Sequence, residues 1–243
     1  MDAGVDFAEV ERLLHAATFE DCRTLWYSSN YVYLARLCAE GRTFAAVYKP
    51  EAGESPLWDF PTGQLYRREV AAYRLSRLLE WNFVPPTVVR DGPHGVGAVQ
   101  LYVEHDPRSH YFEQREDPAL HPQLHRIAVF DFIANNADRK GGHCLLDEHR
   151  RIWGIDHGLC FHTQYKLRTV MWDWAGEAIA PDILEGVEDT GLRIAAETPE
   201  AAPLLEVVEP DEAGAMLSRM ERLLASRSFP LPGPHRSYPW PLV

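Results

Sequence analysis

The sequence predicts an α+β protein of two lobes, with a β-rich lobe first and a mostly helical lobe after it. Three observations lead to this fold class. Residues 22–50 carry the short apolar runs and turn residues of successive strands, residues 65–81 carry one helical stripe, and the pattern beyond residue 103 is mostly helical with one hairpin. The length of 243 residues fits one large domain or two lobes that share a cleft.

The first lobe is expected over residues 1–103. Apolar residues alternate in its strands and recur every three to four positions in its helices, and a segment rich in Pro and Gly separates the two patterns. In chain order, the elements expected are a helix over 5–17, strands over 22–50, a loop over 51–63, a helix over 65–81, and strands over 85–90 and 96–104.

The second lobe is expected over residues 104–228. The elements expected there are a helix over 122–135, a hairpin of strands 143–147 and 151–156, and a helix over 211–227. Residues 229–243 form a tail with five prolines, which predicts an extended segment.

Composition narrows the class of protein. A formal net charge of −12 argues against a broad nucleic-acid surface, whose affinity comes from clustered cations. No apolar run reaches the roughly 18 residues that could cross a bilayer, and the acidic start is unlike a signal peptide. The four cysteines form no CxxC pair, which suits reduced thiols. We therefore expect a cytoplasmic protein, and the scarcity of lysine beside abundant Arg, Ala and Pro points to a bacterial one.

Residues 132–158 concentrate polar chemistry between apolar runs: FIANNADRKGGHCLLDEHRRIWGIDHG. Phosphoryl transfer from ATP requires a carboxylate that orients the acceptor and hard oxygen ligands for one or two Mg²⁺ ions. Kinases place the first carboxylate ahead of a hairpin, a metal-binding side chain five residues later, and a second acid after the hairpin. Asp138, His143 and Asp156 have this order and spacing.

The first lobe supplies the matching cation. Lys49 is its single lysine and ends the predicted strand AVYKP, while Glu69 lies in the helix that follows. A Lys–Glu pair would direct the ammonium toward the α- and β-phosphates. The turn Ser28-Ser29-Asn30 stands where a phosphate-covering turn is expected, although it carries no glycine. Surface ion pairs with neighbouring arginines are the alternative for Glu69, and plain turn chemistry for residues 28–30.

The motifs NNADRKGG, IDHG, VYKP and REVAAYRLSRLL resemble the phosphatidylinositol 3-/4-kinase-like family, above all type II phosphatidylinositol 4-kinases and their small bacterial relatives, and more distantly HipA-type kinases. The resemblance runs from about residue 25 to 175 and implies a bilobal protein-kinase-like fold with ATP and Mg²⁺ or Mn²⁺ as cofactors. The roles it implies are Lys49 on the phosphates, Glu69 as its support, Asp138 with Arg139 as catalytic residues, Asp156 as metal ligand, and 99–105, including Val103 and Glu104, as the hinge that meets adenine.

Two departures from the family pattern bear on the chemistry. His143 stands where asparagine is usual, and imidazole binds Mn²⁺ better than Mg²⁺, so metal preference is open. No cysteine cluster or basic surface loop for reaching a bilayer is present. The expected acceptor is therefore a small polyol or inositol-like molecule, or a protein side chain, rather than a lipid.

Other interpretations stay open from the sequence. A pseudokinase that binds nucleotide without turnover, or an enzyme that transfers AMP, would keep the same residues. Zinc binding by the His and Cys residues between 143 and 162 fits no pattern of paired ligands, and Cys144 and Cys160 are better read as apolar core groups. Residues 161–174 follow Asp156 as an activation segment would, and Lys166 and Arg168 in it could meet an anionic acceptor, with surface solvation as the alternative.

Overall fold

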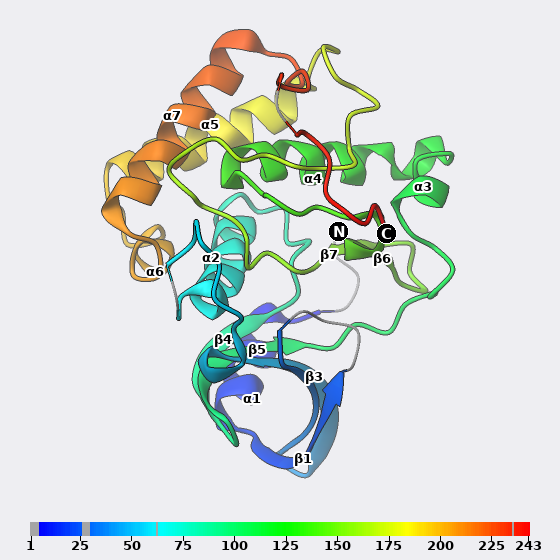
Figure 1. The fold of residues 1–243 in the computed structure, drawn as a ribbon, viewed down its shortest axis with the longest axis vertical. Coiled ribbons are helices and arrows are strands. Elements are labelled where there is room, and N and C mark those ends of the chain that lie inside the picture. Colours follow the sequence, from blue (N-terminus) through cyan, green and yellow to red (C-terminus); the bar gives the residue numbers. More distant parts are fainter. Residues whose placement is uncertain (1–4, 26–29, 62, 235) are drawn as a thin grey trace.

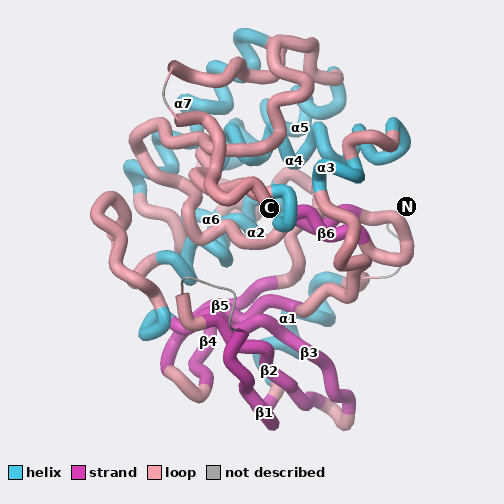
Figure 2. The backbone as a smooth tube through the Cα atoms, turned by 45° about the vertical axis from the view of Figure 1, so that its right-hand side comes forward, coloured by secondary structure: helices cyan, strands magenta, loops and turns pink. Residues whose placement is uncertain are grey.

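The computed structural model describes residues 5–25, 30–61, 63–234 and 236–243, and it confirms the α+β class. A twisted antiparallel sheet with one covering helix fills one end of the molecule, and helices fill the other (Figure 1). The sheet order is β1-β2-β3-β5-β4, and a separate two-stranded ribbon, β6-β7, lies in the helical part (Figure 2). The two parts meet around the second helix, α2.

In its described residues, the first part contains five strands and two helices of more than one turn. In chain order they are α1 (Phe7–Ala16), β1 (Thr18–Leu25), β2 (Val32–Ala39), β3 (Arg42–Pro50), α2 (Leu65–Leu78), β4 (Thr87–Gly92) and β5 (Gly95–Leu101). Leu13 and Leu14 of α1 pack with Leu37, Tyr48 and Val99 of the sheet into a core of its own. Because successive strand residues point to opposite faces, this core occupies one face of the sheet.

The second part is built around α4, whose residues from Ile127 to Ala134 are all buried. Its elements are α3 (Tyr111–Gln114), α4 (His121–Ala134), β6 (Cys144–Leu146), β7 (Ile152–Gly154), α5 (Pro181–Ala195), α6 (Ala202–Leu205) and α7 (Pro210–Ser226). The apolar side of α2, including Ala71 and Leu75, packs into the same core. Thus α2 belongs by sequence to the first lobe and by packing to the second as well.

The register of β3 against β5 sets the position of Lys49. Lys49 pairs with Ala98 and Pro50 with Gly97. A Cβ at Gly97 would lie 2.4 Å from the carbonyl oxygen of Lys49, so a side chain there would push the two strands apart. Glycine at 97 therefore allows the close approach that fixes the strand end carrying Lys49.

The connection after β5 differs slightly from expectation, because the strand ends at Leu101 and not at residue 104. Val103 and Glu104 lie in the connector to α3, which is joined to the ribbon by a hydrogen bond from Asp106 N to Leu146 O (3.1 Å). A lobe boundary at 103 and a tail boundary at 228 remain our predictions. Among the described residues no helix is both long and apolar enough to cross a bilayer.

Candidate active site

The loop after α4 is held by two buried asparagines. Asn135 ends α4 with a left-handed φ of 55°, and its side-chain amide donates to the carbonyls of His162 and Gln164 while its oxygen accepts from Lys166 N. The Asn136 side chain donates to Asp131 and accepts from Asp138 N (3.0 Å). These bonds explain why NNAD is polar yet buried: each amide fixes a neighbouring segment of irregular backbone.

The side chain of Arg139, in the same loop, is fully buried. Its guanidinium forms a forked ion pair with Asp131 of α4 and donates to the carbonyl of Ile155 (3.0 Å) and to Nε2 of His157 (2.7 Å). Burial lowers the pKa of His157 far below its usual value, which leaves the ring neutral and able to accept this bond. Arg139 is one of the expected catalytic residues, and its side chain points into the interior with no exposed surface.

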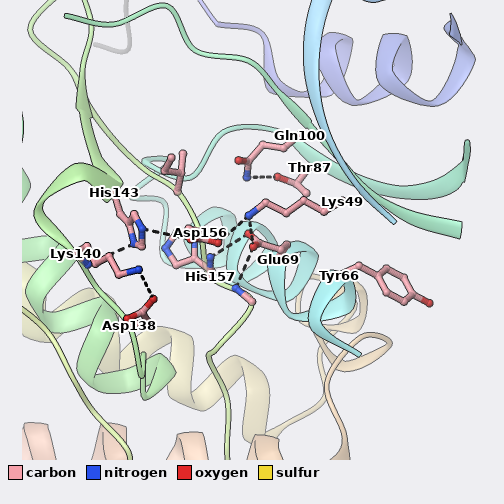
Figure 3. Close-up of polar contacts among 12 residues, drawn as sticks. Lys49, Tyr66, Glu69, Thr87, Gln100, Asp138, Lys140, His143, Asp156 and His157 are labelled. Atoms are coloured by element: carbon pink, nitrogen blue, oxygen red, sulfur yellow. Dashed lines mark hydrogen bonds and ion pairs between the residues drawn. The ribbon is translucent and has the colours of Figure 1, made fainter. Parts of the chain in front are cut away.

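Lys49 lies between two acids from different parts of the chain (Figure 3). Its ammonium pairs with Glu69 of α2 and, at 3.0 Å, with Oδ1 of Asp156. Glu69 also accepts from the main-chain N–H groups of His157 (3.0 Å) and Gly158 (3.1 Å). Burial alone would lower the pKa of Lys49, but the two carboxylates outweigh it and raise the pKa above its usual value.

Asp156 and His143 face each other across the ends of the ribbon. Oδ2 of Asp156 lies 3.3 Å from Nε2 of His143, and Asp156 has a φ of 60°, a left-handed conformation that Asp tolerates better than most residues. The Lys49 ammonium holds the pKa of Asp156 far below its usual value. Burial lowers the pKa of His143 to about 4. Near pH 7 the pair is therefore a carboxylate beside a neutral imidazole, a donor set that can bind a divalent metal.

Asp138 lies in the loop after α4 and has the ammonium group of Lys140 beside it. Nζ of Lys140 is 3.1 Å from Oδ2 of Asp138. Burial raises the pKa of Asp138 from its usual value, and the Lys140 ammonium offsets part of that shift. Arg139 between them points inward, so alternation along the extended loop turns Asp138 and Lys140 outward.

Another ion pair joins the loop before α2 to the segment after Asp156. Lys166 contacts Asp59 at 2.7 Å, with both side chains mostly buried, so Lys166 is not available for a substrate. Ser28 and Ser29 lie outside the described residues. The side chain of Asn30 accepts from Ser55 N (2.8 Å).

Metal binding by the cysteines finds no support in their surroundings. Cys144 and Cys160 are buried in the main apolar core, and burial raises the pKa of the Cys144 thiol to about 12. Within the described ranges, no group of three or more His, Cys, Asp or Glu side chains is arranged around a metal position. A metal at Asp156 and His143 would need further oxygen ligands from water or phosphate.

Sequence reasoning did not give roles to Asp131, Lys140 or His157. The scarcity of lysine singled out Lys140, and its position two residues after Asp138 could have predicted the contact. No local signal shows that Asp131, seven residues before Asp138, is the partner of Arg139, because that pairing depends on how the loop folds back onto α4.

Together the sheet, the central helices and this loop–ribbon arrangement define a protein-kinase-like fold. Many solved structures share it, among them the following two. A hydra Fam20 structure with sugar has a TM-score of 0.56 at 15% identity and covers 93% of this chain and 89% of its own. The Golgi casein kinase with Mn/ADP bound has a TM-score of 0.52 at 13% identity and covers 90% and 75%.

Sequence comparison places the chain more closely. It is 40% identical over 247 aligned positions to Protein Rv2133c of Mycobacterium tuberculosis, covering 88% of each, and it belongs to the family of that protein. It is also 30% identical over 133 residues to phosphatidylinositol 4-kinase gamma 4 of Oryza sativa subsp. japonica, a match to 47% of this chain and 23% of the rice protein. No protein-family model matches the chain.

Proposed function

We propose that this protein is an ATP-dependent phosphotransferase of the phosphatidylinositol 3-/4-kinase-like type that acts on a hydroxyl acceptor. A small polyol or inositol-like molecule, or a protein side chain, is favoured over a lipid. The observation that carries the proposal is the convergence of Lys49, Glu69 and Asp156, which come from a strand, a helix and the end of a ribbon. Groups so far apart in sequence meet around one ammonium.

Each residue then has a defined task. Lys49 would balance phosphate charge, and Glu69 would hold its ammonium in place. Asp138 would accept the proton of the acceptor hydroxyl, with Lys140 beside it to offset charge near the transferred group. Arg139 would keep the loop and the segment 155–157 in register.

The donor set fits a divalent metal bound with ATP. Asp156 supplies carboxylate oxygen and His143 a neutral ring nitrogen, and such a mixed pair favours Mn²⁺ over Mg²⁺ more than a pair of oxygen ligands would. When bound, ATP supplies the phosphoryl group and the metal neutralises phosphate charge. The hinge around Val103 and Glu104 would meet adenine through its backbone.

The test is incubation with ATP and either Mg²⁺ or Mn²⁺, with ADP and AMP measured separately against a panel of polyols, inositols and peptides. Asp156→Asn should abolish metal–ATP binding. Asp138→Asn should retain binding and lose at least about 100-fold in turnover, the usual contribution of a positioned base. Asp182→Asn, which removes an exposed carboxylate on α5, is the control. Normal binding and turnover in both site variants would refute the assignment.

Two observations favour a second candidate, a nucleotide-binding module without turnover. His143 replaces the asparagine usual in the family, and Lys140 already pairs with Asp138. Tight ATP binding with neither ADP nor AMP formed under either metal would support this candidate. AMP attached to a target would instead identify an AMP-transferring enzyme.

A further inference from the structure

The chain after α7 is firmly attached at its beginning. Phe229 exchanges two main-chain hydrogen bonds with the segment after Trp174: Gly176 N donates to Phe229 O and Phe229 N donates to Glu177 O, both at 2.9 Å. The ring of Phe229 is buried against Trp174 and His125. A buried aromatic ring with two backbone bonds makes this an anchor.

Farther along, the chain bonds first to the segment 169–172 and then to the loop that follows Asp138. Ser237 O accepts from Thr169 N (3.1 Å) and from the indole N–H of Trp172 (3.0 Å), and Leu242 O accepts from Gly141 N (2.8 Å). In Figure 1 this red segment runs down beside α4 and ends next to β6. It therefore passes from residues 169–172 to the loop after Asp138.

The crossing segment is loosely packed. Trp240 is 77% exposed, Val243 56% and Tyr238 49%, while Ser237 and Pro239 are the buried positions among residues 237–243. A single main-chain hydrogen bond stabilises a segment by no more than the entropy cost of ordering one residue's backbone. So few buried side chains leave the segment free to detach locally without unfolding the protein.

We propose that residues 237–243 form a releasable strap over the acceptor side of the candidate site, hinged at Phe229. The proposal rests on the proposed function. Leu242 is bonded to Gly141, directly after Lys140, and Ser237 is bonded to Thr169, which forms a parallel bridge with Arg139. The strap thus runs from the segment that pairs with Arg139 to the residue directly after Lys140, next to the loop that carries Asp138. An acceptor approaching Asp138 would gain room when the strap leaves.

Amide hydrogen exchange of the full chain tests the strap without reference to catalysis. The N–H groups of Gly141 and Thr169 should exchange at matched rates and faster than Ile155 N–H, which bonds inside the loop to His143 O. Trp172→Phe removes one bond to Ser237 and leaves Gly141 untouched. It should still speed exchange of both amides about fivefold, as the loss of one hydrogen bond predicts.

Trp81→Phe changes an indole that lies beside Gly186 of α5; it is the matched control and should leave both rates unchanged. If Trp172→Phe changes Thr169 alone, or if both amides exchange only with global unfolding, the strap is refuted. Deletion of residues 237–243 adds a functional arm: ADP release from ATP with Mg²⁺ or Mn²⁺ should rise at least about threefold as the closed state is removed.

Unchanged or lower ADP release from a deletion variant with wild-type thermal stability would also overturn the strap. Absence of ADP and AMP from both wild type and deletion would instead reject the proposed function, and the exchange rates would still decide whether the strap opens.

Discussion

Replacing Glu69 with Gln should strongly destabilise the fold, because Glu69 joins Lys49 to the main chain of His157 and Gly158. The carboxylate serves three donors, and an amide keeps one acceptor oxygen and adds a donor. At least one N–H then loses its partner, and the ammonium loses one of its two counter-charges. Removing one member of a buried ion pair costs about 3–5 kcal/mol. Asp156 still pairs with Lys49, so we expect the lower end, about 3 kcal/mol.

For a chain of this size, about 1 kcal/mol corresponds to a shift of roughly 2–4 °C in Tm. Thermal unfolding followed by circular dichroism should therefore show Tm lower by about 6–12 °C. Glu185→Gln on the exposed face of α5 is the control and should shift Tm by less than about 2 °C. The double variant Lys49→Met, Glu69→Gln should lose less than the sum of the two single losses. A Glu69→Gln shift no larger than the control's would refute the reasoning.

Arg139→Lys keeps the charge but loses the planar fork on Asp131, so urea unfolding should show a loss of about 3 kcal/mol; a loss under about 0.5 kcal/mol would contradict the inward role. His143 has a folded pKa of about 4 against 6.5 unfolded, so the unfolded state binds the extra proton between these values. Stability should fall by about 2–3 kcal/mol as pH drops from 7 to 4.5, and His143→Gln should flatten this part of the profile. Lys166→Ala should leave Asp59 without its ion-pair partner, at a cost of about 1–2 kcal/mol in the free energy of local opening. Proteolytic cleavage within residues 51–63 should then be several-fold faster, and cleavage at the wild-type rate would exclude a docking role for this pair.

Much of the fold follows from local pattern. The helix predicted over 122–135 is α4 (His121–Ala134), and the hairpin predicted between His143 and Asp156 is the ribbon β6-β7. These elements could be predicted because periodicity and turn residues act over a few positions. The order of Asp138, the ribbon and Asp156 likewise fixes where two acids stand, since a short hairpin returns the chain to its starting point.

The features that could not be predicted from local sequence depend on contacts between distant segments. The Lys49–Glu69 pair was expected from the kinase-like pattern, but local sequence also left surface ion pairs with nearby arginines open for Glu69. Those arginines bond elsewhere, Arg68 to Glu212 and Arg74 to Glu11. Only the packing of α2 between the two parts turns Glu69 toward Lys49. The bonds of Ser237 to Thr169 and of Leu242 to Gly141 could not be predicted from the proline-rich pattern either, because every residue carries a carbonyl acceptor.

The hydrogen bonds from the main-chain N–H groups of residues 157 and 158 to Glu69 affect which residues can be substituted among proteins of this fold. Every amino acid except proline has a main-chain N–H group. The contact of Glu69 with residues 157 and 158 therefore depends on the path of the backbone and not on which side chains these residues carry. Relatives could carry another residue at 157, with different side-chain packing around it, while the carboxylate of Glu69 keeps its two hydrogen bonds to the main chain. Chemical variation at residue 157 is thereby uncoupled from the contact that joins the sheet to the helices.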